Sequence, residues 1–69
     1  MIKQDSFVEG KQYRVVSREG LHFFSIGTVV TFIGYDDDGD AEFSGEYINL
    51  AGNKSILHQC LLADDLEEI

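Results

Sequence analysis

The residue types best suited to chemistry in this chain are two histidines and one cysteine. His58 and Cys60 are two positions apart, so a strand would place both on one face, with His22 as the third such group. Such groups can hold a metal, or a histidine can activate the thiol. A structural zinc site needs four ligands, and a thiol hydrolase needs a shaped pocket that 69 residues scarcely supply. We therefore expect no enzyme, no metal and no cofactor, and we expect Cys60 to be a small core residue.

A run of aspartates around Gly39 raises the question of calcium. The run comprises Asp36, Asp37, Asp38 and Asp40. If the run opens a calcium loop, the sixth position is Ala41 instead of glycine, and the twelfth is Tyr47 instead of glutamate. The loop chemistry is therefore incomplete. The run is better explained as the solvated tip of a hairpin, with Asp38-Gly39 as a two-residue turn.

The charge balance excludes several classes of partner. Thirteen acidic residues against five basic ones give a net charge of −8. The cations are scattered along the chain at Lys3, Lys11, Arg14, Arg18 and Lys54. Nucleic-acid backbones and anionic membranes both require clustered cations. We expect direct binding to neither.

The length and the cysteine content limit the architecture and the compartment. Sixty-nine residues form one domain, and a single cysteine allows no internal disulfide. The first residues resemble no signal peptide, and no apolar run reaches the ~20 residues of a membrane helix. These features are typical of a cytoplasmic protein.

The elements that must position these residues are short strands. Alternation predicts a first strand over residues 12–17, a hairpin over residues 27–44 and a second hairpin with Gly52-Asn53 at its turn. We expect a 3₁₀ turn over residues 61–65 and a last strand over residues 66–69, with a short C-terminal helix as the alternative. The strands should form a small, closed antiparallel barrel. Its predicted core is Tyr13, Val15, Val30, Phe32, Phe43 and Leu66.

The order of these parts resembles a known architecture. GKQYRVV leads into a loop with His22-Phe23-Phe24, and IGTVVTF, DDDGD and LLADDLEEI follow. This order resembles the small SH3-like (Src-homology-3-like) barrel proteins that occur as stand-alone chains in bacteria and bacteriophages. The resemblance covers residues 10–69 and implies a five-stranded antiparallel barrel. Residues 1–9 would be a loosely ordered lead-in, with Phe7 against the barrel.

Two functional hypotheses from different classes follow. The sequence lacks tryptophan and the ALYDY pattern, so recognition of proline-rich ligands is not implied. The core of so small a domain has little room for eight aromatic residues, so some should be exposed and anchor a protein partner. The candidate partner-binding residues are His22, Phe23, Phe24, Tyr35 and Tyr47 with Asp36, Asp37, Asp38 and Asp40. The chain would then be a small adaptor, either a monomer or a weak homodimer.

The alternative is an acidic nucleic-acid mimic that inhibits a DNA- or RNA-handling enzyme. Its carboxylates would come from the Asp36–Asp40 run and from a second cluster, Asp64, Asp65, Glu67 and Glu68. The affinity of a mimic for a basic partner should fall steeply with salt, whereas aromatic docking should be less sensitive.

Overall fold

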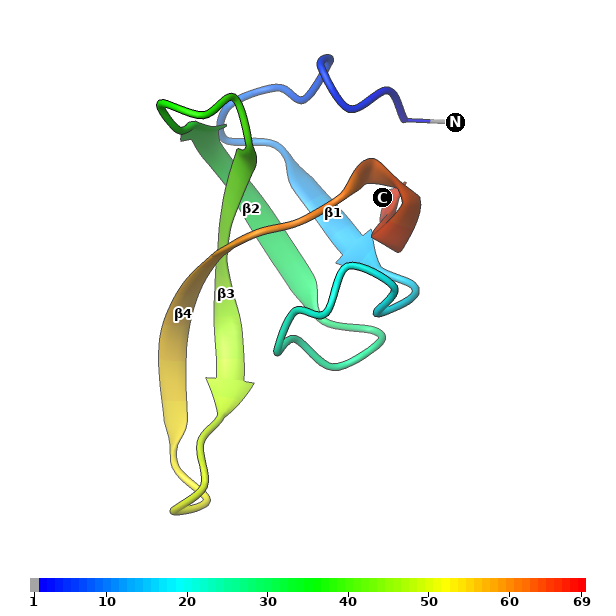
Figure 1. Cartoon of the computed structure of the whole chain (residues 1–69). Helices are drawn as coiled ribbons and strands as arrows, with labels where there is room; N and C mark the ends of the chain where they lie inside the picture. Colours follow the sequence, from blue (N-terminus) through cyan, green and yellow to red (C-terminus); the bar gives the residue numbers. More distant parts are fainter. Residues whose placement is uncertain (1) are drawn as a thin grey trace.

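Five antiparallel strands and one 3₁₀ turn make up the fold in the computed structural model, which describes residues 2–69 (Figure 1). The elements are β1 (Gln12–Val15), β2 (Val29–Tyr35), β3 (Ala41–Ile48), β4 (Lys54–Cys60), η1 (Ala63–Asp65) and β5 (Leu66–Glu68). They form one sheet in the order β4-β3-β2-β1-β5. The predicted all-β class is confirmed, as is the 3₁₀ turn before the last strand. The alternative of a C-terminal helix is wrong, because β5 pairs antiparallel with β1.

The sheet is not closed into a barrel. Each inner strand pairs with both of its neighbours, whereas β4 pairs only with β3 and β5 only with β1. Within residues 2–69, β4 and β5 are therefore two free edges of a curved sheet (Figure 1).

The hydrophobic core lies on the concave side of this sheet. All six predicted core residues are buried, so alternation identified the inward face correctly. The core also contains Phe7, Phe24, Ala41, Leu61 and Ala63. Phe43 meets Phe7 edge-to-face at a centroid distance of 5.0 Å, and Phe7 stacks on Phe32 at 5.4 Å. These contacts use the preferred geometries of aromatic pairs.

The N-terminal segment belongs to this core although it forms no strand. Phe7 is 7% exposed, and its N–H donates to the Tyr35 hydroxyl. That hydroxyl donates in turn to the carbonyl of Gln4. The Gln4 side chain accepts a hydrogen bond from the N–H of Ala63 at 2.6 Å. The segment expected to be a loose lead-in therefore supplies a core aromatic and is bonded to β2 and to η1.

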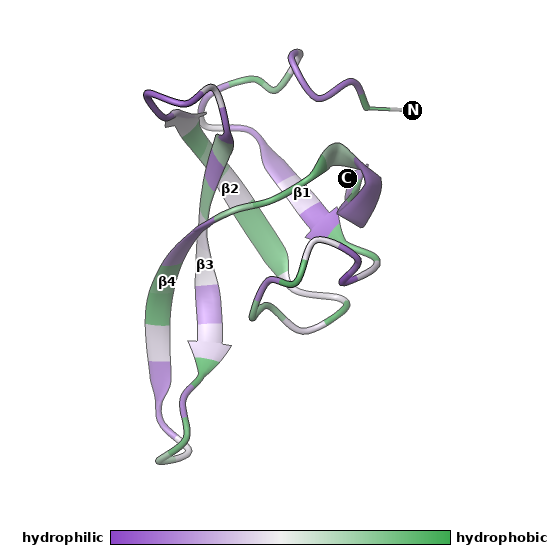
Figure 2. Cartoon of the chain, in the orientation of Figure 1, coloured by the Kyte–Doolittle hydropathy of each residue, from purple (hydrophilic) through white to green (hydrophobic). Residues whose placement is uncertain are grey.

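Both hairpin turns are longer than the sequence patterns indicated. Five residues, Asp36–Asp40, separate β2 from β3, so the expected two-residue Asp38-Gly39 turn is wrong. Five residues, Asn49–Asn53, likewise separate β3 from β4. In each loop the first side chain accepts hydrogen bonds from the N–H groups of the third and fifth residues. Figure 2 shows the first of these loops as a hydrophilic cap between β2 and β3.

One glycine inside β3 allows the long loop between β1 and β2 to pack on the sheet. A Cβ at Gly45 would lie 2.9 Å from the ring of Phe24 and 2.8 Å from a methyl of Val30. Any side chain at this position would push Phe24 away from the strand. Phe24 therefore anchors the loop and is fully buried.

Candidate interaction surface

The β3–β4 hairpin extends well beyond the rest of the sheet (Figure 1). Pairing of Tyr47 with Ser55 and of Gly45 with Leu57 places these residues on the concave face. Ile48 and Ile56 alternate with them and lie on the opposite face, where they are 60% and 64% exposed. The projecting end of the hairpin therefore carries apolar side chains on both faces.

An open apolar groove of about 660 Å³ lies between this hairpin and the loop after β1. Its walls are formed by Phe23, Tyr47, Ile48, Asn49, Leu50, Ala51 and Leu57. Phe23 is 66% exposed, and Leu50 at the hairpin tip is fully exposed. Large side chains with this much apolar surface in water are typical of a surface that binds another molecule.

Phe23 is held at the rim of the groove by its neighbours. His22 and Phe24 on either side are both buried, which turns the Phe23 ring outward. The Phe23 N–H donates to the side-chain oxygen of Gln59 on β4 at 2.7 Å. The ring is therefore exposed on a backbone that is fixed at both ends, and such preorganisation reduces the entropy lost on binding.

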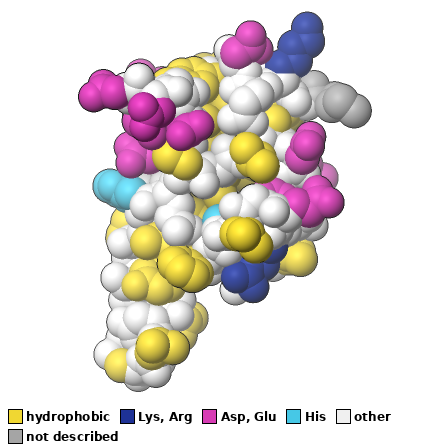
Figure 3. Space-filling view, viewed as in Figure 1, with side chains coloured by type: hydrophobic (Ala, Val, Ile, Leu, Met, Phe, Trp, Pro, Cys, Tyr) yellow, Lys and Arg dark blue, Asp and Glu magenta, His cyan; other side chains and the backbone are white. Residues whose placement is uncertain are grey.

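All of the groove residues except Phe23 come from one stretch of the chain that has no carboxylates. No acidic residue occurs between Tyr47 and Ala63, and Lys54 is the single formal charge in this stretch. On the face shown in Figure 3, the acidic side chains lie over the body of the molecule and not over the projecting hairpin. Sequence reasoning missed Leu50 and Leu57 as candidates, although this long acid-free interval was a visible signal.

The acidic loop forms a separate feature near the opposite end of β3. The Asp36 carboxylate accepts the N–H groups of Asp38 and Asp40, each at 2.9 Å. The hydrogen bond from the Asp40 N–H is the main cause that lowers the pKa of Asp36 below its ordinary value. One aspartate of the run is therefore a structural cap, while Asp37, Asp38 and Asp40 are exposed at the surface.

Cys60 lies beside this loop and is exposed, so the prediction that it is a core residue is wrong. Its thiol donates to Asp36 at 3.4 Å. Partial desolvation, together with the nearby carboxylates of Asp36, Asp40 and Glu42, raises the pKa of the Cys60 thiol to about 11. The thiol is therefore protonated at neutral pH and is a poor nucleophile. His58 shares the outer face of β4 with it, as predicted.

Ligand atoms of Asp36, Asp40 and Cys60 lie within 4.8 Å of one another. This exposed group matches neither set of metal ligands that the sequence raised, because it lacks both histidines of the first set and Asp38 of the second. The protonated thiol and the internally bonded Asp36 explain the cluster without a bound ion.

His22 and Asp65 form a buried polar pair. Asp65 is fully buried, and His22 is 2% exposed. The Asp65 carboxylate accepts hydrogen bonds from the Ser17 hydroxyl, the Glu19 N–H and the Gly20 N–H. The His22 Nδ1 accepts the Phe24 N–H, which leaves Nε2 to donate to the Ser17 carbonyl at 2.8 Å. Both residues therefore hold the loop after β1 and have no surface available to a partner.

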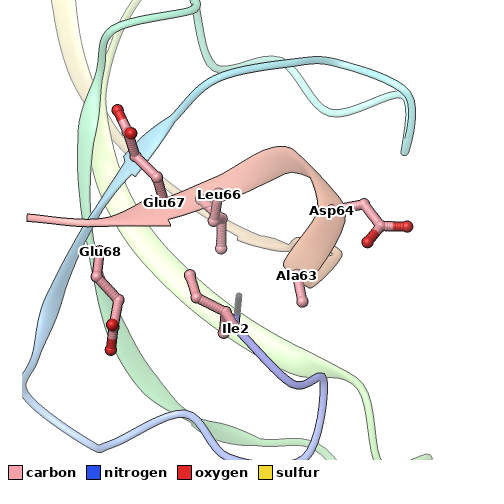
Figure 4. Close-up of a pocket in the computed structure, with 6 residues that line it drawn as sticks. All are labelled: Ile2, Ala63, Asp64, Leu66, Glu67 and Glu68. Carbon is pink, nitrogen blue, oxygen red and sulfur yellow. The ribbon is translucent and has the colours of Figure 1, made fainter.

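The second acidic cluster is largely engaged within the molecule. Glu68 pairs with Lys11 at 2.6 Å, and Glu67 pairs with Arg14 at 3.3 Å. A hollow of about 270 Å³ lies beside them, where Figure 4 shows Ile2, Ala63 and Leu66 turned inward and Asp64 turned away. With Asp65 in the core, this cluster offers fewer free carboxylates than its sequence suggested.

The five candidate aromatic and histidine residues fall into three groups. Phe23 and Tyr47 share the groove, whereas His22 and Phe24 are buried. Tyr35 is 40% exposed beside the acidic loop, but its hydroxyl is bonded to the N-terminal segment. The predicted residues are therefore not brought together in one site.

Comparisons of the chain with protein-family models, with curated proteins and with solved structures gave no significant match. Within residues 2–69, no helix has the length and apolarity needed to cross a bilayer.

Proposed function

We propose that this chain is a small protein-interaction module that docks a partner protein in the groove between Phe23 and the β3–β4 hairpin. The observation that carries the proposal is the groove itself: aromatic and aliphatic side chains exposed on a fixed backbone. Aromatic anchors at the centre of such patches supply most of the binding energy in protein interfaces. The acidic body provides solubility and steers the approach of partners.

The finer fold assignment that accompanies this proposal is an SH3-like barrel of bacterial or bacteriophage type. Its support is the order of parts: a first strand, a long loop, two hairpins, a 3₁₀ turn and a short last strand. The groove is bordered by the long loop and by the second hairpin. Fold alone carries no function, so the proposal depends on the groove and not on this likeness.

The alternative, an acidic nucleic-acid mimic, has less support. A mimic needs a row of carboxylates that are free to occupy phosphate-binding sites. Asp65 is buried, Asp36 caps its own loop, and Glu67 and Glu68 are paired with cations. The carboxylates that remain free in the two clusters are those of Asp37, Asp38 and Asp40 in the loop after β2 and that of Asp64 in η1, so they do not form one continuous row.

The test compares two side chains of the same loop that are equally exposed. Phe23 and Ile26 are both 66% exposed, but only Phe23 lines the groove. The partner is first captured from the source cell, and its affinity for the variants is then measured by calorimetry. Phe23→Ala should weaken binding by about 1–3 kcal/mol, and Ile26→Ala should leave it unchanged.

Salt distinguishes the two functions. Binding through the groove should change little when the ionic strength is raised, whereas a mimic should lose affinity steeply. Equal affinities of Phe23→Ala and wild type, together with a steep salt dependence, would replace the interaction module with the mimic.

A further inference from the structure

The outer edge of β4 presents backbone groups that no residue of the described chain satisfies. The Leu61 N–H donates to the Ala41 carbonyl, and the Asn49 N–H donates to the Asn53 carbonyl. Residues of β4 with odd numbers therefore direct their peptide groups toward β3. The peptide groups of Lys54, Ile56, His58 and Cys60 point the other way, along the free edge of the sheet.

The two free edges of the sheet differ in how they are protected. The edge strand β5 has three residues, two of them glutamates. Short length and charge are common ways of preventing an edge from pairing with another chain. The edge strand β4 has seven residues, KSILHQC, without proline and without a carboxylate. Among the described strands, β4 is the long edge, and Lys54 at its first position is its single formal charge.

From this edge we infer that the chain forms a homodimer in which β4 of one copy pairs antiparallel with β4 of a second copy. The axis of the dimer passes beside Leu57, so that Leu57 faces its own counterpart. The inference does not rest on the function proposed above, because it concerns the edge of the hairpin and not the partner in the groove.

Charge favours a second copy as the occupant of this edge. Two copies that each carry a charge of −8 repel one another wherever carboxylates meet. The stretch from Tyr47 to Ala63 is free of carboxylates, so this repulsion is weak where the middle of one β4 meets the middle of the other.

The register of the dimer also brings opposite charges together. With Leu57 opposite Leu57, Lys54 of one copy lies opposite Cys60 of the other. Cys60 is paired with Glu42 on β3, and its thiol contacts Asp36. Lys54 makes no ion pair within residues 2–69. In the dimer, each Lys54 meets the carboxylates of Asp36 and Glu42 that lie beside Cys60 of the other copy, once on each side of the axis.

The first experiment measures the oligomeric state of the purified chain by sedimentation velocity over a range of concentrations. Wild type should shift from monomer to dimer as the concentration rises. Lys54→Glu should raise the dimer dissociation constant about tenfold or more, since a cross-strand ion pair becomes a repulsion. Lys3→Glu makes the same change in net charge away from the edge and should leave association near that of wild type.

A charge exchange tests the predicted contact. Glu42→Lys alone should weaken the dimer, and combining Glu42→Lys with Lys54→Glu should restore it. A wild-type chain that remains monomeric at every concentration overturns the inference. Equal weakening by Lys54→Glu and Lys3→Glu also overturns it, because the effect would then be one of net charge.

Disulfide trapping tests the register independently of affinity. In a Cys60→Ser background, Leu57→Cys places one thiol on each side of the axis. Directly opposed residues of this kind have Cα atoms about 4.5 Å apart, within the range of a disulfide. Ser55→Cys lies on the same face but opposite Gln59, so its two thiols remain far apart. Rapid covalent dimerisation of Leu57→Cys alone supports the pairing, and equal trapping of both variants contradicts it.

Discussion

At the scale of single residues, Asp65 has the largest structural role, although its acidic sequence neighbours suggest a surface position. Asp65 lies in the acidic run LLADDLEEI, but it is fully buried and binds the loop after β1. Its carboxylate accepts a hydroxyl and two backbone N–H groups. A Cβ at Gly20 would lie only 2.8 Å from this carboxylate, so the loop and Asp65 are closely fitted. Asp65 therefore connects the loop after β1 to the turn that precedes β5.

Asp65→Ala should lower the free energy of unfolding by about 3 kcal/mol or more, because three hydrogen-bond donors lose the buried, charged acceptor that they share. Asp65→Asn should also destabilise the fold, since an amide nitrogen would face a donor. The measurement is urea denaturation followed by circular dichroism. The matched control is Asp64→Asn, at an exposed neighbour, which should change stability little. Equal effects at the two positions would contradict this role.

The same residue predicts a pH dependence. Burial opposes ionisation of Asp65, but the Ser17, Gly20 and Glu19 donors and His22 outweigh it and lower the pKa of the carboxyl. A lowered pKa in the folded state stabilises the protein above the unfolded value of about 3.9. This contribution is lost as the pH falls below that value toward the folded pKa. Asp65→Asn should therefore show a weaker loss of stability between pH 5 and pH 3 than wild type.

At the scale of elements, the two hairpin loops use one design with different charge. The sequences DDDGD and NLAGN place an Asx residue first, a glycine fourth and an Asx residue last. The first residue caps both loops in the same way, at distances of 2.9–3.0 Å. The second loop shows that an amide oxygen serves as well as a carboxylate. The charge of the first loop is therefore not required for its conformation.

Asp36→Asn together with Asp37→Asn should leave the melting temperature unchanged or raise it slightly, because repulsion decreases and the cap is retained. Asp36→Ala should lower the melting temperature, since two N–H groups lose their acceptor. Asp37→Ala is the control and should be nearly neutral. Thermal denaturation measures all three variants, with and without millimolar calcium. A clear rise of the wild-type melting temperature with calcium would show that the folded loop binds the ion.

At the scale of the whole molecule, stability depends on a small aromatic core. Phe7, Tyr13, Phe32 and Phe43 contact one another across the sheet and the N-terminal segment. A domain of this size rarely has more than ~3–5 kcal/mol of net stability without a disulfide or a metal. Loss of one central ring therefore threatens the entire fold.

Phe32→Ala should cost about 3–5 kcal/mol through lost burial and the cavity left behind, enough to unfold most of the population at room temperature. Circular dichroism and the loss of dispersed amide resonances measure the effect. Ile33→Ala, at the next and half-exposed position of β2, is the control and should remain folded. A folded Phe32→Ala chain would contradict this prediction and show that the remaining aromatic residues are enough to stabilise the fold.

The sequence by itself determined that the chain is built of short strands, and it determined the inward faces of β1, β2, the first half of β3 and β5. These features depend on local alternation, which is why all six predicted core residues are buried. The open edges of the sheet, the five-residue loops and the exposure of Cys60 were not predictable in this way. They depend on which strands pair and in what register, and a shift of one residue exchanges the two faces of a strand.

The candidate site shows the same division. The sequence placed His22, Phe23 and Phe24 together as exposed aromatic candidates, and it treated Asp65 as one of four surface acids. The tertiary structure buried His22 and Phe24, left Phe23 at the rim of a groove and put Asp65 in the core. The physical reason is that burial of a loop residue depends on distant partners. Phe24 is buried because there is space for it beside Gly45. Asp65 is buried because it finds hydrogen-bond donors in Ser17, Glu19 and Gly20. No local sequence pattern encodes these distant contacts.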